Sequence, residues 1–251
     1  MTQLIRQPLP IRLTHWLNVA LLAVMIGSGL QIFNAHPTLY AADTSREDRT
    51  VLTLPGPVEG QPGRHEMTLL GLHVNTGPIA IEEFPRPVTV GGWLAGARRW
   101  HLGIMWLFML NGLLYVLYQF TSGQARHRFM RREDWSGIPQ VIRHYLFRAP
   151  LPEGDGYNPL QRLTYTGIVL FFGPLVVLTG LAMSPQWDAW FPWYVDLFGG
   201  RQFARTWHFL LMAGLVAFTA AHLVLVAMAG WPTFWSMIAG GPRPKPEAAH
   251  E

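Results

Sequence analysis

The stretch RTWHFLLMAGLVAFTAAHLVLV, residues 205–226, decides the fold of this chain. After its first residue it contains no Asp, Glu, Lys or Arg, and it is long enough to cross a bilayer, which takes about 20 apolar residues. It nevertheless carries two imidazoles, His208 and His222, fourteen residues apart. Polar side chains are costly in lipid unless they have partners. A membrane helix with two histidines therefore predicts a role for both.

Three further stretches are free of charged side chains over a comparable length. They span 13–42, 100–125 and 163–187, and the quoted stretch belongs to a fourth, 206–242. The first apolar run is too long for a signal peptide, and no clear small-x-small cleavage site follows it. The fold class is thus all-α integral membrane: a four-transmembrane-helix bundle in one domain, 1–241, with a disordered tail, 242–251. We place the helices near 13–34, 100–121, 160–183 and 204–230.

Composition narrows the function classes. The chain of 251 residues is 50% hydrophobic and only 14% charged, which is low for a soluble domain. The net charge of +4 comes from Arg residues that flank the apolar spans, so a membrane surface is favoured over nucleic acid. The absence of Cys excludes disulfides, thiolate zinc sites, iron–sulfur ligation and the attachment of c-type haem. A cofactor must then be held noncovalently by His, Met or carboxylate.

The placement of Arg predicts the orientation in a bacterial inner membrane. Arg6, Arg12 and the cluster within 126–132 put both termini and the 122–159 loop in the cytoplasm, by the positive-inside rule. The 35–98 loop is then periplasmic. It is rich in Pro and Gly, and a loop of this length is uncommon unless it is functional, so we interpret it as a docking surface.

Two shorter segments carry interfacial patterns. Apolar side chains within 135–147 fall on one helical face, which predicts a short amphipathic helix on the cytoplasmic interface: Trp135, Ile138, Val141, Ile142, Tyr145 and Leu146. The segment QWDAWFPWYVDLF, 186–198, is typical of an aromatic belt at the other interface.

Four histidines lie on or at the ends of the apolar spans, and they sort by depth into two pairs. His208 and His222 are nearly four helical turns apart, so they share a face and are separated by about 21 Å along the helix axis. His101 begins the second span at the periplasmic end, level with His208. His15 begins the first span at the cytoplasmic end, level with His222. Each pair therefore combines two different helices.

Haem iron with two axial imidazoles fits this arrangement best. A single His at the end of a membrane helix is more often an interfacial residue than a ligand. Four His that form pairs at two depths are better explained by a bound group between the members of each pair. Zinc would need a tetrahedral cluster, usually with Cys or carboxylate, and a proton relay would need intramembrane acids, which the spans lack. We predict two haem groups, one held by His101 and His208 on the periplasmic side and one by His15 and His222 on the cytoplasmic side.

Three runs resemble a known superfamily. RLTHWLNVALLAVMIGSGLQIF (12–33), GYNPLQRLTYTGIVLFFGPLVVLTGLAMSP (156–185) and ARTWHFLLMAGLVAFTAAHLVLV (204–226) resemble helices one, three and four of the bacterial cytochrome b561 and nickel-hydrogenase cytochrome b superfamily. The third-helix run is similar to that of the formate dehydrogenase gamma subunit. The long 35–98 loop, which opens NAHPTLY, resembles the thiosulfate-reductase-like branch, whose members are often paired with periplasmic molybdopterin oxidoreductases.

The resemblance implies two b haems and a quinone site close to the cytoplasmic haem. In the formate dehydrogenase subunit this site includes the Asn of an Asn-Ala-Gly-Gln motif. Here the motif reads Asn-Pro-Leu-Gln, so Asn158 is a candidate quinone ligand, although Leu160 replaces the Gly and an N-cap role fits Asn158 equally. Arg205 is a candidate partner of a haem propionate; Arg12 and Arg162 are favoured as positive flanks.

The expected function is that of an electron-transfer subunit of a quinone-linked oxidoreductase complex, which connects a periplasmic redox protein, of molybdopterin type, with the quinone pool. Two alternatives stay open. A stand-alone b561-type oxidase, such as a superoxide oxidase, would need no protein partner. A transporter without haem would need intramembrane carboxylates or paired broken helices, and the spans contain neither pattern.

Overall fold

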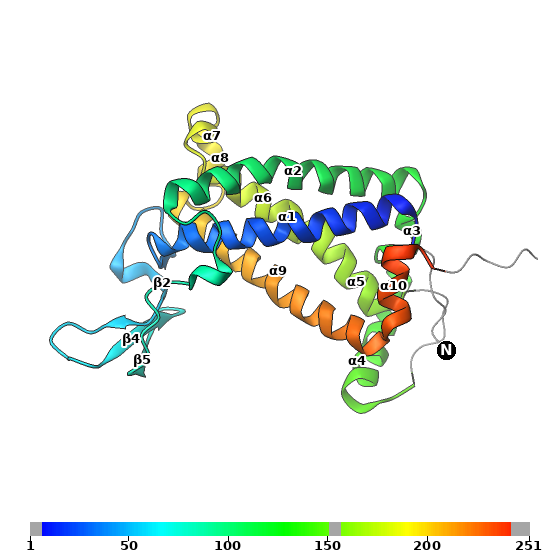
Figure 1. Ribbon diagram of the computed structural model, residues 1–251, viewed down its shortest axis with the longest axis horizontal. Helices are drawn as coiled ribbons and strands as arrows, with labels where there is room; N and C mark the ends of the chain where they lie inside the picture. Colours follow the sequence, from blue (N-terminus) through cyan, green and yellow to red (C-terminus); the bar gives the residue numbers. More distant parts are fainter. Residues whose placement is uncertain (1–6, 151–156, 242–251) are drawn as a thin grey trace, which may run out of the picture. The chain divides into compact units, whose positions relative to one another are not determined.

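The computed structural model describes residues 7–150 and 157–241, so the predicted tail, 242–251, lies outside the described residues. Four helices in it are long and apolar enough to cross a membrane (Figure 1). They are α1 (Leu9–Asn34), α2 (Leu94–Thr121), a third span over Pro159–Ala182, and α9 (Arg201–Ala229). The predominantly helical, four-span fold expected from the apolar runs is confirmed.

The helices extend further than the apolar runs that predict them. α2 begins at Leu94 rather than near 100 and includes Arg98 and Arg99, while α1 includes Arg12. A helix does not end where its apolar run ends, because its backbone hydrogen bonds continue as long as the chain stays helical. Charged turns at the ends of a span lie in the interfacial region, where lipid imposes no cost on them.

The third span is not one regular helix. It consists of α5 (Pro159–Gly167), a π-helical stretch η4 (Ile168–Phe172) and α6 (Gly173–Ala182). Pro174 explains the irregularity, because it has no backbone N–H to donate and its ring clashes with the preceding turn. Single π-turns of this kind are common near functional sites.

The segment between α1 and α2 contains a five-stranded antiparallel sheet, so the chain as a whole is not all-α. The strands are β1 (Thr38–Tyr40), β2 (Thr50–Thr53), β3 (Gly56–Pro57), β4 (His65–Leu69) and β5 (Leu72–Gly77). Their order is β1-β2-β4-β3, with β5 paired to the other edge of β4. Figure 1 shows the β4–β5 hairpin projecting beyond the end of α1.

The described residues form two compact units, and each long span contributes to both. One unit combines 19–110 with 173–214; we call it the sheet unit, because it contains β1 to β5. It also contains the short helices α7 (Pro185–Trp190) and α8 (Pro192–Asp196). The other, which we call the loop unit, combines 7–18, 111–150, 157–172 and 215–241.

Short helices make up much of the loop unit. They are α3 (Ala125–Arg128), the 3-10 helix η3 (Arg132–Gly137), α4 (Ile138–Phe147) and α10 (Trp231–Ala239). α4 buries Val141 completely but leaves Leu146 and Phe147 exposed. α10 was not expected from the sequence. Its last turn lies against the start of α1, where Arg12 donates to the carbonyl of Ile238 and Trp16 Nε1 donates to that of Met237 at 3.0 Å.

Candidate functional site

In the sheet unit, α2 and α9 bring His101 and His208 together. The centroids of the two imidazole rings are 6.1 Å apart, and the ring planes are inclined by 69°. In the loop unit, α1 and α9 bring His15 and His222 together in nearly the same way, with centroids 6.2 Å apart and planes inclined by 63°. The structure thus places the four candidate ligands in the two pairs that their spacing predicts.

The separation of the rings suits one metal ion between each pair. Metal–imidazole bonds of about 2 Å on both sides, plus about 1.2 Å from each nitrogen to its ring centre, separate the centroids by about 6 Å. Among residues 7–150 and 157–241, no group of three or more His, Asp or Glu side chains could enclose a metal ion. Each pair could then offer a metal ion two imidazole ligands, and a porphyrin is a group that would supply the remaining ones.

Hydrogen bonds define which nitrogen of His101 and His208 is available. His101 Nδ1 lies 3.0 Å from Ser28 Oγ, whose hydroxyl already donates to the carbonyl of Val24 at 2.7 Å. His208 Nδ1 lies 2.9 Å from the carbonyl of Val176, which can only accept. Both imidazoles therefore carry their proton on Nδ1, and Nε2 is the nitrogen that can bind a metal.

Two glycines accommodate these rings. A Cβ on Gly29 would lie 3.5 Å from His101 Cε1, and one on Gly180 would lie 3.3 Å from His208 Cε1. The imidazoles therefore pack directly against the backbones of α1 and α6. This close approach leaves little freedom for the ring planes to rotate.

Arg205, the candidate propionate partner, holds the start of the sheet segment. Its guanidinium donates to the carbonyls of His36 and Thr38 and lies over the ring of Phe33, 5.5 Å from the centroid. Thr206 reinforces this attachment with a 2.8 Å hydrogen bond to the carbonyl of Tyr40. The contacts account for two of the five N–H donors of Arg205, so its role toward a propionate stays a prediction.

Asn158, the candidate quinone ligand, caps α5. Its Oδ1 accepts from the backbone N–H of Gln161 at 2.9 Å, and Gln161 Oε1 accepts from the backbone N–H of Asn158 at 3.1 Å. This reciprocal pair is a capping box. The N-cap role is therefore present in the structure, and the amide NH₂ is the part of Asn158 that a quinone carbonyl could use.

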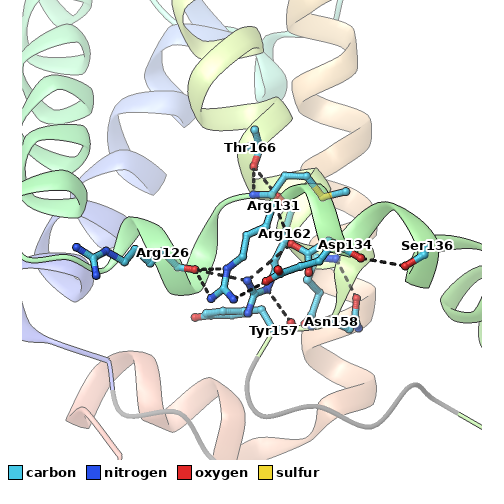
Figure 2. A network of polar contacts seen from close by, with 11 residues as sticks. Arg126, Arg131, Asp134, Ser136, Tyr157, Asn158, Arg162 and Thr166 are labelled. Carbon is cyan, nitrogen blue, oxygen red and sulfur yellow. Dashed lines mark hydrogen bonds and ion pairs between the residues drawn. The ribbon is translucent and has the colours of Figure 1, made fainter.

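A polar network lies around Asn158 and the residue before it, Tyr157 (Figure 2). Arg162 is almost buried, donates from Nε to the carbonyl of Tyr157 at 3.1 Å, and lies 3.7 Å from the carboxylate of Asp134. Asp134 also accepts from the backbone N–H of Arg131 at 2.8 Å. Arg162 thus serves as an internal ion-pair partner rather than a simple positive flank.

The structure adds a buried polar cluster that the sequence did not single out. Gln119, in the last turns of α2, is fully buried, and its amide oxygen and nitrogen have no hydrogen-bond partner among the described residues. Nearby in the same unit, Arg128 donates to Gln7 at 2.7 Å and lies over the ring of Tyr157. The available signal was the position of Gln119, an amide side chain near the end of an apolar span.

Comparison with known proteins assigns the family. The family described as prokaryotic cytochrome b561 matches residues 6–240, nearly the whole chain. The chain belongs to this family. The superfamily expected from the helix runs is thereby confirmed, and together with the four apolar helices it makes the protein a multi-pass bacterial membrane cytochrome of the b type that serves electron transport. No solved structure shows a significant match to the chain.

Three curated relatives show the range of the family. A putative protein-methionine-sulfoxide reductase subunit, YedZ1, from Azospira oryzae is 30% identical over 87% of this chain and 88% of its own length. A probable Ni/Fe-hydrogenase B-type cytochrome subunit from Cupriavidus necator is 29% identical over 49% of this chain and 56% of its own. The putative cytochrome YdhU from Escherichia coli is 30% identical over 53% and 54%.

Proposed function

We propose that this protein is a di-haem b cytochrome that transfers electrons between a periplasmic redox partner and the quinone pool of the inner membrane. The observation that carries the proposal is the presence of two imidazole pairs with ring centroids 6.1 and 6.2 Å apart, one in each unit of the chain. Both pairs use α9, and each takes its second member from a different helix.

The residues of this chain would hold each haem and control its surroundings. Bound haem supplies one-electron chemistry, and its potential depends on the axial ligands, their hydrogen bonds and the polarity around it. His101 and His208 would hold one group, and His15 and His222 the other. Because all four histidines belong to helices apolar enough to cross a membrane, both haems would lie in apolar surroundings.

The quinone site belongs, in this proposal, to the loop unit and includes Asn158. The capping box uses the side-chain oxygen of Asn158 and leaves its NH₂ group to donate to a quinone carbonyl. The network of Arg162 and Asp134 would keep the start of α5 in place when quinone enters and leaves. Protons for quinone reduction would come from the cytoplasm, on the side where the N-terminus and the 122–159 loop are proposed to lie.

The partner would dock on the 35–98 segment, on the periplasmic side. Arg205 and Thr206 attach β1 to the first turns of α9, the helix that also carries His208. A protein that contacts this segment would therefore bind close to α9, the helix that carries the candidate haem ligand His208. The names of the relatives, a reductase subunit and hydrogenase cytochrome subunits, support a redox enzyme as partner; we propose one of the molybdopterin type.

Haem stoichiometry tests the proposal. A pyridine haemochrome assay with protein quantitation should find two haems per chain. His101→Ala and His222→Ala should each remove one haem and leave the other. His73→Ala is the matched control, because His73 lies on the exposed β5 beside Glu66 and should retain both. A chain without haem, or either membrane variant with both haems intact, would contradict the assignment.

The dependence on a partner can be tested separately. In the purified cytochrome without any other protein, added quinol should reduce the haems. The protein alone should neither oxidise quinol continuously with oxygen nor reduce quinone continuously with superoxide as the electron donor. Sustained turnover under these conditions would favour the stand-alone oxidase instead.

A further inference from the structure

The two pairs of histidines differ in what contacts their second nitrogen. In the sheet unit, Ser28 Oγ lies 3.0 Å from Nδ1 of His101, and Thr179 Oγ1 lies 3.2 Å from Nδ1 of His208. Both hydroxyl side chains are completely or almost completely buried, with 0% and 1% exposure. Such contacts to the outer nitrogen of a metal-bound imidazole change how strongly its inner nitrogen donates to the metal.

The same local arrangement occurs on two different helices. Ser28 precedes Gly29 on α1, and Thr179 precedes Gly180 on α6, and in each case the glycine faces the imidazole whose Nδ1 contacts the hydroxyl. Each hydroxyl also bonds the backbone of its own helix, at 2.7 Å to Val24 and 2.8 Å to Leu175. These bonds take up the hydroxyl protons, so the oxygen lone pairs face the Nδ1–H groups. The Nδ1–H of His208 is shared between two acceptors, because the carbonyl of Val176 also lies 2.9 Å from it.

The pair in the loop unit has aromatic neighbours instead. Trp16 contacts His15 edge-on with ring centroids 5.4 Å apart, and Phe218 is stacked on His222 with centroids 5.8 Å apart. Over 7–150 and 157–241, no side-chain hydrogen bond involves either of these imidazoles, whereas both imidazoles of the sheet unit have one.

We propose that Ser28 and Thr179 are positioning residues that fix the axial imidazoles of His101 and His208 and lower the midpoint potential of the haem between them. An Nδ1–H that donates to an oxygen makes Nε2 a stronger donor, and a stronger donor stabilises ferric iron over ferrous. The haem between His15 and His222 lacks this effect. The two haems would therefore differ in potential, with the group in the sheet unit the lower of the two as far as the axial ligands decide it.

The inference rests on the proposed haem ligation, and spectroelectrochemical titration of the purified, haem-loaded chain tests it. Wild-type protein should titrate as two one-electron components. Ser28→Ala and Thr179→Val should each shift the same component upward, the double variant should shift it further, and the other component should stay in place. The shift in Thr179→Val should be the smaller one, because the carbonyl of Val176 still accepts from His208 Nδ1–H. Thr219→Val is the matched control, since within the described part of the chain Thr219 on α9 makes only the hydroxyl-to-carbonyl bond, to Leu215 at 2.8 Å.

A conservative variant separates the hydroxyl from the packing. Thr179→Ser retains the hydroxyl but removes the methyl group, so its potential should stay close to that of wild type, whereas Thr179→Val should not. Equal potentials for these two variants would overturn the proposal, as would two variants that move different components. If haem is absent altogether, the proposed function fails; if both haems are present with unchanged potentials, only this inference fails.

Discussion

Asn158 and Gln161 form a reciprocal cap at the start of the third span. The side-chain oxygen of Asn158 accepts from the backbone N–H of Gln161 at 2.9 Å, and the side-chain oxygen of Gln161 accepts from the backbone N–H of Asn158 at 3.1 Å. The residue proposed to bind quinone therefore also has a structural role. A simple alanine variant would confuse the two roles, since it removes both at once.

Asn158→Ser separates them. Ser caps helices about as well as Asn, so haem content and melting temperature should match wild type, while the loss of the amide donor should raise the KM for quinone. Asn158→Ala should in addition cost about 1 kcal/mol of stability. Quinol-dependent haem reduction measures the first effect and thermal denaturation in detergent the second. Unchanged quinone kinetics in the Ser variant would remove Asn158 from the site.

The two glycines that face imidazoles should respond differently to a methyl group. In Gly180→Ala the new Cβ would lie 3.3 Å from His208 Cε1, which is closer than ordinary contact, so the ring must shift. We expect a cost of about 1 kcal/mol and an altered low-spin EPR signal of the haem in the sheet unit. Gly29→Ala, at 3.5 Å from His101, should be tolerated. Identical EPR signals for Gly180→Ala and wild type would show that the contact is not constraining.

Asp134 should matter for stability because its partner is almost buried. Asp134→Ala would leave the Arg162 guanidinium without its carboxylate, and the side chains of the pair are only 9% and 12% exposed. Loss of one partner of a buried pair costs about 3 kcal/mol. Asp48→Ala is the control, because the Arg46–Asp48 pair is more than half exposed and should contribute little. Equal melting temperatures for the two variants would contradict the expected difference.

The attachment of β1 should weaken in acid. Burial, and then the charge of Arg205, lower the pKa of His36 below its ordinary value of 6.5. The unfolded chain therefore binds this proton more readily than the folded chain does. The contribution of neutral His36 to the free energy of unfolding is fully present above pH 6.5. It is lost as the pH falls through the lowered pKa of the folded chain. The protection factors for amide hydrogen exchange at Thr38–Tyr40, which correct for the intrinsic slowing of exchange in acid, should be smaller at pH 5 than at pH 7.5, and His36→Gln should reduce that difference.

Much of this architecture follows from local rules that act along the chain. Apolar length sets the four spans, since a bilayer requires about 20 residues to cross. The spacing of His208 and His222 puts both on one face of α9, because fourteen residues make nearly four turns. The capping box is also local: Asn158, Pro159 and Gln161 are the residue types that begin a helix. The prokaryotic cytochrome b561 family could be predicted from the resemblance of the runs 12–33, 156–185 and 204–226 to helices of its members.

What the sequence could not decide depends on contacts between distant residues. The uncharged stretch 206–242 covers α10 but did not identify it as a separate helix, and its end is held by Arg12 and Trp16 from the other end of the chain. Neither could spacing identify Ser28 and Thr179 as neighbours of imidazoles on other helices, or Arg162 as the partner of Asp134. Helical periodicity specifies which face a residue occupies, but only tertiary packing specifies which helix that face meets and at what height.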